Sequence, residues 1–85
     1  MTPSEALADI RGYAGVGRIV LTFHAEQRMG ERGVTARDVR HALVNAGRCN
    51  GLPEDRWKVY GADLSGEELV LVVVLEDGVI VVTVF

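Results

Sequence analysis

The sequence predicts a single α+β domain, in which N-terminal helices pack on a three- to five-stranded antiparallel sheet. The first half of the chain carries helix-start signals followed by apolar residues at helical spacing, whereas the second half ends in two valine-rich strands. Helices followed by a run of strands are typical of the α+β class. With 85 residues, of which 48% are hydrophobic, the chain can bury one core and no second one. We therefore expect residues 1–85 to form one domain.

The first predicted helix lies in residues 1–17, which also include a glycine-rich linker. Thr2 can cap this helix, Pro3 suits its first position, and Glu5 stands three residues after the cap, as in a capping box. The helix is expected to end in a linker that contains three glycines, Gly12, Gly15 and Gly17. These glycines do not form a phosphate-binding loop, because they precede a strand and no Gly-Lys-Ser/Thr sequence is present.

A short strand and two helices are expected next, at the start of a core that spans residues 18–85. Residues 18–23 are rich in β-branched and apolar side chains, as in a strand. The second helix is expected over residues 24–32, with a glycine directly after it as a stop signal. The third helix opens at Thr35, which a capping-box acid follows, and its apolar residues recur at helical spacing until Gly47 stops it.

The second half of the chain is predicted to form the remaining strands. Residues 50–53 have the composition of a turn. A half-buried strand is expected around Trp57, whose alternation with Val59 favours a core position for the indole ring. Residues 69–75 and 79–85 are two apolar strands joined by Asp-Gly, a pair that favours hairpins. Their near-continuous valine indicates burial on both faces of the sheet, or one face covered by a partner.

The formal net charge of −3 argues against a nonspecific nucleic-acid binder, but the charge is unevenly distributed. All nine basic residues lie between Arg11 and Lys58, and the five acids of the same stretch leave it with +4. Eight of the nine are arginine, which suits bidentate contacts with phosphate or carboxylate. A genome rich in G and C would also favour arginine codons, so the bias alone does not decide between the two explanations.

The second helix carries the most informative residues of the sequence. His24, Arg28 and Arg32 follow one another at intervals of four, so they stand within about 80° of one another on one helix face. RNA cleavage without a metal needs a base for the 2′-hydroxyl proton, an acid for the leaving 5′-oxygen and cations for the phosphate. His24 can act as base or acid, with the two arginines as phosphate clamps. The alternative is a solvated helix surface with ordinary ion pairs.

A second proton-transfer group is missing from this stripe. Tyr60, His41 and Glu31 are the candidates, and the sequence does not choose among them.

The same helix also carries a resemblance to a known family. The run His24-x-x-x-Arg28-Met29-x-x-Arg32-Gly33-Val34-Thr35-x-x-Asp38-Val39 resembles the opening motif of an uncharacterised bacterial family of small toxin-like domains. Residues 81–85 resemble the closing strand of that family, so the resemblance covers residues 19–85. The family is similar to RelE- and BrnT-type toxins, which share a ribonuclease fold of helices followed by a sheet.

The resemblance implies a function and a set of site residues. It implies the toxin component of a toxin–antitoxin pair, a metal-independent ribonuclease with an antitoxin protein and RNA or the ribosome as partners. His24, Arg28 and Arg32 would form the active-site set, and Thr83 on the last strand would add a further side chain. One departure is the overall acidity of this chain, because RelE-type toxins are strongly basic. RNA or ribosome binding would therefore depend on the basic middle of the sequence.

A non-catalytic protein–protein interaction module is the alternative function. In that hypothesis the apolar last strand pairs edge to edge with a partner, or with a second copy to give a homodimer.

No metal or cofactor is expected, because His24 and His41 are far apart and Cys49 has no partner at ligand spacing. The longest apolar run, residues 69–75, is too short to span a membrane, and the N-terminus does not read as an export signal. With a single cysteine and no disulfide framework, the expected location is the cytoplasm.

Overall fold

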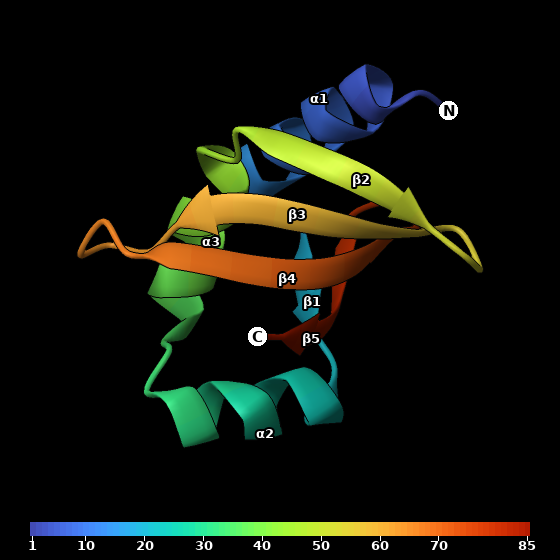
Figure 1. Cartoon of the computed structure of the whole chain (residues 1–85). Helices are drawn as coiled ribbons and strands as arrows, with labels where there is room; N and C mark the ends of the chain where they lie inside the picture. Colours follow the sequence, from blue (N-terminus) through green and yellow to red (C-terminus); the bar gives the residue numbers. More distant parts are fainter.

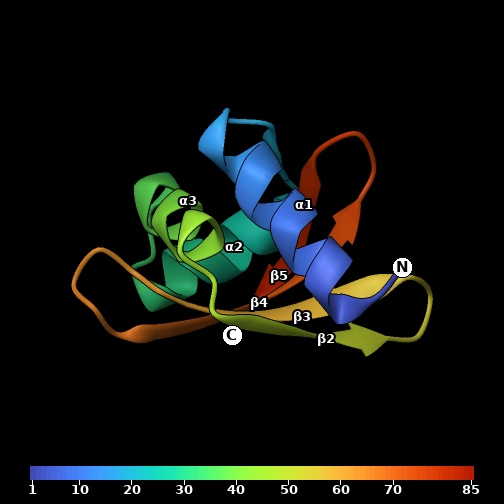
Figure 2. The same ribbon diagram turned by 90° about the horizontal axis from the view of Figure 1, so that it is seen from above.

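The computed structural model describes residues 1–85 and confirms the α+β class. All three helices lie on one side of strands β2, β3 and β4 (Figures 1 and 2). The elements, in chain order, are α1 (Pro3–Gly15), β1 (Ile19–Leu21), α2 (Phe23–Arg32), α3 (Ala36–Val44), β2 (Arg48–Leu52), β3 (Arg56–Ala62), β4 (Glu68–Leu75) and β5 (Val79–Val84). The helices are too short and too polar to cross a lipid bilayer.

The five strands form one open sheet in the order β1-β5-β4-β3-β2. Strands β2 to β5 pair antiparallel, as predicted, but β1 pairs parallel to β5, so the sheet is mixed. A parallel pair needs a long connection, and here α2, α3 and three strands lie between β1 and β5 in the chain. Strand β1 lies at the edge of the sheet beyond β5. The last strand is therefore internal, and the edges open to strand pairing belong to β1 and β2.

Helix α1 begins as the sequence predicts and ends later. The side chain of Thr2 accepts from the Glu5 backbone N–H at 3.2 Å, and the Glu5 carboxylate accepts from the Thr2 N–H at 2.8 Å. Gly12 and Gly15 lie inside the helix rather than in a linker. The buried face of the helix extends past Gly12 to Ala14. Its residues Ala6, Ile10 and Ala14 are fully buried, so the helix continues through both glycines. The first 17 residues thus belong to the same core as the rest of the chain.

Helix α2 begins one residue earlier than expected, at Phe23, because Thr22 caps it. The Thr22 hydroxyl accepts from the Ala25 N–H at 3.1 Å and stops the strand at Leu21. Gly33 ends the helix in a left-handed conformation with φ of 68°, as the sequence predicts.

Helix α3 has the predicted capping box between Thr35 and Asp38. It ends at Val44 with Asn45 as its cap, two residues before the predicted stop at Gly47. The Asn45 side chain donates to the carbonyl of His41 at 3.0 Å, which satisfies one of the free carbonyls at the helix end.

The turn predicted at residues 50–53 is the one misplaced element of the second half. Asn50, Gly51 and Leu52 pair with β3 as strand β2, and the turn lies over the next three residues, where Glu54 and Asp55 have positive φ angles. Gly51 pairs with Trp57, and a Cβ on Gly51 would lie in ordinary contact with the Trp57 ring, at 3.5 Å. Trp57 packs half-buried against the core, as predicted.

The core fills the space between the helices and the sheet. Its largest fully buried side chains are Ile10, Leu43, Leu71, Val39, Val59, Val73, Val79, Val81 and Val84. The opposite face of the sheet carries no helix, so burial there is incomplete: Val70 and Val74 of β4 are half-buried, and only Val72 between them is buried. The valine run therefore reflects one covered face and one face that is apolar in the centre.

Candidate functional site

The strand register defines which side chains share the face of the sheet that the helices leave uncovered, here called the open face. Cys49, Val59 and Leu71 are paired with one another across β2, β3 and β4, and all three are buried toward the helices. Because successive side chains of a strand point to opposite faces, their neighbours Arg48, Tyr60 and Val70 point to the open face.

Three rows of paired residues cross the open face, two of them from β5 to β2 and the third from β1 to β2. The first row holds Phe85, Val70, Tyr60 and Arg48; the second holds Thr83, Val72, Lys58 and Asn50; the third holds Val20, Ile80, Val74, Arg56 and Leu52. The Phe85 N–H donates to the Val70 carbonyl at 2.9 Å, which places Phe85 at the end of the first row. No acidic residue belongs to these three rows, and one acid, Glu68, lies on the same face beyond the first row, paired with Ala62.

Basic and aromatic side chains meet on this face. The Arg48 guanidinium stacks on the Tyr60 ring, 3.8 Å from its centroid, and the Lys58 Nζ lies 5.7 Å from both the Tyr60 and the Phe85 rings. Arg56 pairs with Glu54 at 3.7 Å, but neither Arg48 nor Lys58 has a carboxylate within 4.0 Å. The two cations nearest the aromatic rings therefore keep their charge available to a ligand.

Helix α2 lies along the C-terminal end of β5 and brings its cationic stripe to the border of the open face. At its start, the Thr22 hydroxyl donates to the carbonyls of Val81 and Val82 at 2.9 and 3.1 Å. Further along, the Arg28 Nε donates to the Val84 carbonyl at 3.4 Å. At its end, Arg32 lines the same hollow as Phe85, together with four acids, Asp38, Asp63, Glu67 and Glu68. The stripe thus runs beside the last residues of β5.

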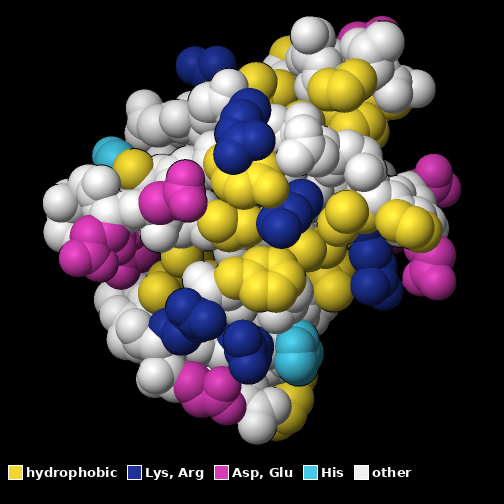
Figure 3. All heavy atoms as spheres, viewed as in Figure 1, with side chains coloured by type: hydrophobic (Ala, Val, Ile, Leu, Met, Phe, Trp, Pro, Cys, Tyr) yellow, Lys and Arg dark blue, Asp and Glu magenta, His cyan; other side chains and the backbone are white.

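The space-filling view shows the two parts as one surface (Figure 3). Dark-blue basic side chains alternate with hydrophobic ones over β2, β3 and β4, and basic side chains with one histidine continue over α2. Acidic side chains gather mainly at the ends of the strands, at the rim of this surface.

The three predicted residues of α2 differ in exposure and in their bonds to other residues. His24 and Arg32 are exposed and form no ion pair. Arg28 is half-buried, and besides its bond to Val84 one terminal nitrogen lies 3.7 Å from Glu31. The other terminal nitrogen of Arg28 has no protein partner, so the guanidinium is held in place with one donor edge free.

Thr83 and Tyr60 both lie on the open face, as neighbours of the stripe. The strand shifts register between Val72 and Val73, so Val82 is an extra residue in β5 and Thr83 is turned to the open face beside Val72. Tyr60 stands two strands from Phe85 in the first row, which corresponds to about 10 Å at the usual strand spacing of about 4.8 Å. The fold therefore places Arg28, Arg32 and Thr83 near the C-terminal end of β5, with His24 at the start of α2 and Tyr60 two strands away.

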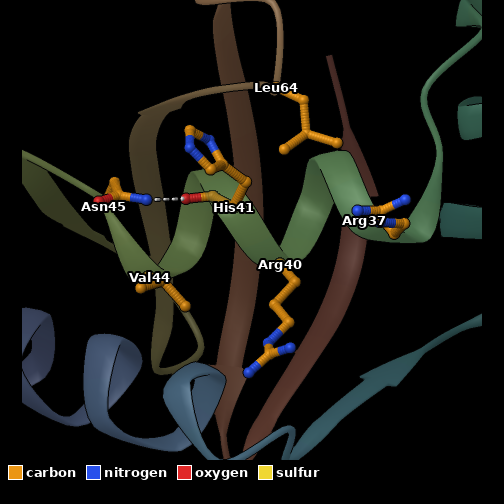
Figure 4. Close-up of a pocket in the computed structure, with 6 residues that line it drawn as sticks. All are labelled: Arg37, Arg40, His41, Val44, Asn45 and Leu64. Carbon is orange, nitrogen blue, oxygen red and sulfur yellow. Dashed lines mark hydrogen bonds between the residues drawn. The ribbon is translucent and has the colours of Figure 1, made fainter.

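His41, the other histidine, lies elsewhere. Its Nδ1 is 2.9 Å from the Ala62 carbonyl, and it lines a hollow around α3 (Figure 4). In that hollow His41 and Leu64 stand on one side of α3, whereas Arg40 points to the other side, toward α1. Arg40 is itself occupied, because it donates to the Ala14 and Gly15 carbonyls at 3.2 and 3.0 Å. The side chains of this hollow do not converge on a common point.

Cys49 and the acidic residues form no second centre. The Cys49 thiol is buried beside the Pro3 carbonyl, 3.3 Å away, and burial raises its pKa, which disfavours the reactive thiolate. No three His, Cys, Asp or Glu side chains stand close enough together to hold a metal ion.

Sequence reasoning missed the basic residues of the sheet. Arg56, Lys58 and Tyr60 alternate along β3 and share the open face, whereas Arg48 reaches it from β2. The period-two spacing of Arg56, Lys58 and Tyr60 is visible in the sequence and could have indicated a cationic strand face. The pairing of Arg48 with Tyr60 is a long-range contact that no local pattern contains.

Comparison with known families covers both parts of this surface. The family model described as Domain of unknown function (DUF4258) matches residues 21–85. The chain belongs to this family. The DUF4258 match includes every element from α2 to β5 and leaves out α1, which contributes to the core but not to the open face. Searches of curated proteins and of solved structures give no match.

Proposed function

We propose that this DUF4258 protein is a metal-independent endoribonuclease, the toxin component of a toxin–antitoxin pair that acts in the cytoplasm. One observation carries the proposal: the His24–Arg28–Arg32 stripe lies along the end of β5, beside an open face that holds Tyr60 and Thr83 and whose strand pairs include a single acid, Glu68. Such an arrangement offers a proton-transfer group and several cations to one bound phosphate.

The reaction follows from these groups. The ribose 2′-oxygen forms a bond to the adjacent phosphorus while the bond from phosphorus to the 5′-oxygen breaks. The 2′-hydroxyl proton passes to a base, and the leaving 5′-oxygen takes a proton from an acid. The products are a 2′,3′-cyclic phosphate and a 5′-hydroxyl. No water or metal is consumed in this step.

The structure suggests how the roles divide. Arg28 and Arg32 face the phosphate, because one edge of Arg28 is free and Arg32 is exposed. His24 exchanges one proton. Tyr60 is the better second group, because it lies on the open face, whereas His41 is bonded to Ala62 on a different side of the molecule. Glu31 is the alternative second proton-transfer group, because it lies beside Arg28. The Thr83 hydroxyl can donate a hydrogen bond to a phosphate oxygen.

The toxin assignment rests on the resemblance of residues 24–39 to toxin-like domains similar to RelE- and BrnT-type toxins. A helical layer beside a β-sheet is the arrangement which that resemblance implies, and the motif residues border the open face. An antitoxin protein is the partner that this proposal requires, and RNA, free or on the ribosome, is its substrate.

The test is induction of the wild-type chain in a bacterial host beside a His24→Ala, Arg28→Ala, Arg32→Ala variant. The matched control carries Arg11→Ala and Arg37→Ala, two exposed arginines of α1 and α3, away from the open face. Each purified variant is first shown to unfold cooperatively. The wild type and the control should arrest growth and fragment RNA, whereas the triple variant should do neither. Harmless growth of the wild type would refute the toxin proposal.

A specific observation also favours the second function, a protein-binding module. Val20, in the edge strand β1, is 58% exposed, and Phe23, which begins α2 two residues after that strand, is 83% exposed. Strand addition by a partner, or by a second copy in a homodimer, would cover both side chains. This function predicts that Val20→Asp with Phe23→Asp abolishes association of the chain while the α2 variants leave it intact. Size-exclusion chromatography with light scattering measures the self-association case.

A further inference from the structure

The charge of the open face contrasts with that of the whole protein. The chain has a formal net charge of −3, yet the strand pairs of the open face hold three cations and a single acid, Glu68, which pairs with Ala62 at the end of the face. Two of the cations, Arg48 and Lys58, lack an ion pair. A cluster of unpaired cations on one face of an acidic protein repels itself, and a polyanion is the ligand that relieves this repulsion.

The aromatic rings indicate which polyanion fits. Phe85 is 46% exposed at one end of the first row, and Tyr60 lies in the same row with the Arg48 guanidinium stacked on it. A nucleobase can stack on the Phe85 ring or on the outer face of that guanidinium plane. Lys58, 5.7 Å from both rings, stands where the phosphate between two such bases would lie.

We infer that the open face is a binding track for single-stranded RNA, with bases stacked on Phe85 and on the Arg48–Tyr60 pair and the backbone held by Lys58 and Arg56. Duplex RNA does not fit, because its bases are stacked on one another and closed to the rings. The first row crosses four strands, about 14 Å at the usual spacing, and aromatic side chains on a sheet of that width stack two or three bases.

The track leads to the α2 stripe at Arg28. The Arg28 Nε donates to the carbonyl of Val84, the neighbour of Phe85, so a strand stacked on Phe85 places its next phosphate beside Arg28. The hollow that Phe85 shares with Arg32 is also lined by the acids Asp38, Asp63, Glu67 and Glu68, so Arg32 is its only cation. This inference rests on the proposed function and names its substrate class. The track residues Arg48, Lys58 and Phe85 bind RNA, whereas the chemistry belongs to α2 and Tyr60.

The experiment separates binding from cleavage by using the full chain with His24→Ala as the parent. A fluorescently labelled RNA of twelve nucleotides and mixed sequence is titrated by anisotropy at several salt concentrations, alone and annealed to its complement. The single strand should bind more tightly than the duplex. Arg48→Gln and Lys58→Gln should each weaken binding and lower the slope of log Kd against log salt by about 0.7.

A variant of Phe85 tests whether a base stacks on its ring. Phe85→Leu keeps an apolar side chain and the Phe85 backbone bond to Val70, so a merely structural role predicts no loss. Loss of one stacked base predicts weaker binding by about fivefold or more with an unchanged salt slope. The control pair, Arg11→Gln and Arg37→Gln, removes equal charge from the helices and should leave the slope unchanged.

Two results would overturn the inference. One is a double Arg48→Gln, Lys58→Gln variant that binds the single strand as tightly as its parent, and the other is equal affinity for the duplex. If the wild type still cleaves RNA, such a result removes the track and leaves the proposed function standing. If the wild type neither binds nor cleaves RNA, both proposals fail, and a protein with an acidic surface becomes the ligand to seek.

Discussion

Gly61 of β3 lies directly against the backbone of Ala42 in α3. A Cβ atom on Gly61 would overlap the Ala42 carbonyl oxygen and lie 2.8 Å from its carbonyl carbon. The obstacle is backbone in the middle of a helix, so it cannot rotate away as a flexible side chain would. Helix α3 therefore approaches the sheet as closely as it does because residue 61 has no side chain.

We expect Gly61→Ala to destabilise the protein by about 3 kcal/mol, because α3 must move off the sheet. The matched control is Gly12→Ala in α1, where a Cβ meets nothing within 4 Å. That change should stabilise the protein by up to about 1 kcal/mol through the higher helix propensity of alanine. Urea unfolding at neutral pH measures both, and equal stabilities for the two variants would contradict the close approach of α3.

Arg40 supplies the cation that the end of α1 lacks. The last turn of α1 has no basic residue of its own, and Arg40 of α3 donates to the Ala14 and Gly15 carbonyls. Arg40→Ala should lower the free energy of unfolding by about 1 kcal/mol, because those carbonyls and the helix dipole lose their partner. Arg37→Ala, one turn earlier on α3 and without such bonds, should stay within about 0.5 kcal/mol of the wild type in the same urea titration.

The capping box of α3 should make the stability of the protein depend on pH in the acidic range. Hydrogen bonds from the backbone N–H groups of Thr35 and Leu64, and from the Thr35 hydroxyl, lower the pKa of Asp38 below its ordinary value of 3.8. The folded state therefore favours the carboxylate, and this stabilisation is complete above pH 3.8 and is lost as the pH falls through the lowered native pKa.

The variant Asp38→Asn keeps an acceptor but removes this titration. Its urea midpoint should lie below that of the wild type near pH 6, and the two midpoints should converge as the pH falls below the native pKa of Asp38. A constant difference at every pH would show that the carboxylate charge is not what the cap stabilises.

RNA cleavage by the proposed mechanism should survive removal of divalent metal. We expect the wild type to cleave a single-stranded RNA at the same rate in excess EDTA, since the cations of the site are side chains. The products should carry a 5′-hydroxyl, which polynucleotide kinase labels directly without phosphatase treatment. Cleavage that stops in EDTA and returns with Mg²⁺ would overturn the mechanism.

Tyr60→Phe tests the second proton-transfer group while the ring stays in place under Arg48. If the phenol is the acid or base, cleavage should slow by about 10²- to 10⁴-fold, and RNA binding by the His24→Ala parent should not change when Tyr60→Phe is added. Glu31→Gln is the comparison, since Glu31 is the competing candidate. A large loss with Glu31→Gln and none with Tyr60→Phe would transfer the role to Glu31.

Local patterns predicted those parts of the fold that depend on neighbouring residues. The caps at Thr2 and Thr35, the stop at Gly33 and the two valine strands all follow from interactions within a few residues. The failures have long-range causes. Residues 50–52 have turn-like composition, but pairing with β3 makes them a strand.

The parallel pairing of β1 was missed for the same reason, because it joins residues about sixty positions apart. Helical spacing predicted the α2 stripe, and the stripe does lie on one face of a real helix. The position of the stripe next to β5 depends on the hydrogen bonds of Thr22 and Arg28 to that strand, and no local pattern predicts these bonds. The basic open face depends on strand register in the same way.

The attachment of α2 to β5 has a consequence for how the chain folds during its synthesis. Thr22 and Val81 are 59 residues apart, and Arg28 and Val84 are 56 apart. A growing chain that has just completed α2 has nothing to bury Ala25 and Met29 against, and contacts of such long range form late and slowly. During synthesis the stripe therefore exists without its neighbouring strand, and the nascent chain acquires an assembled surface only after β5 has been made.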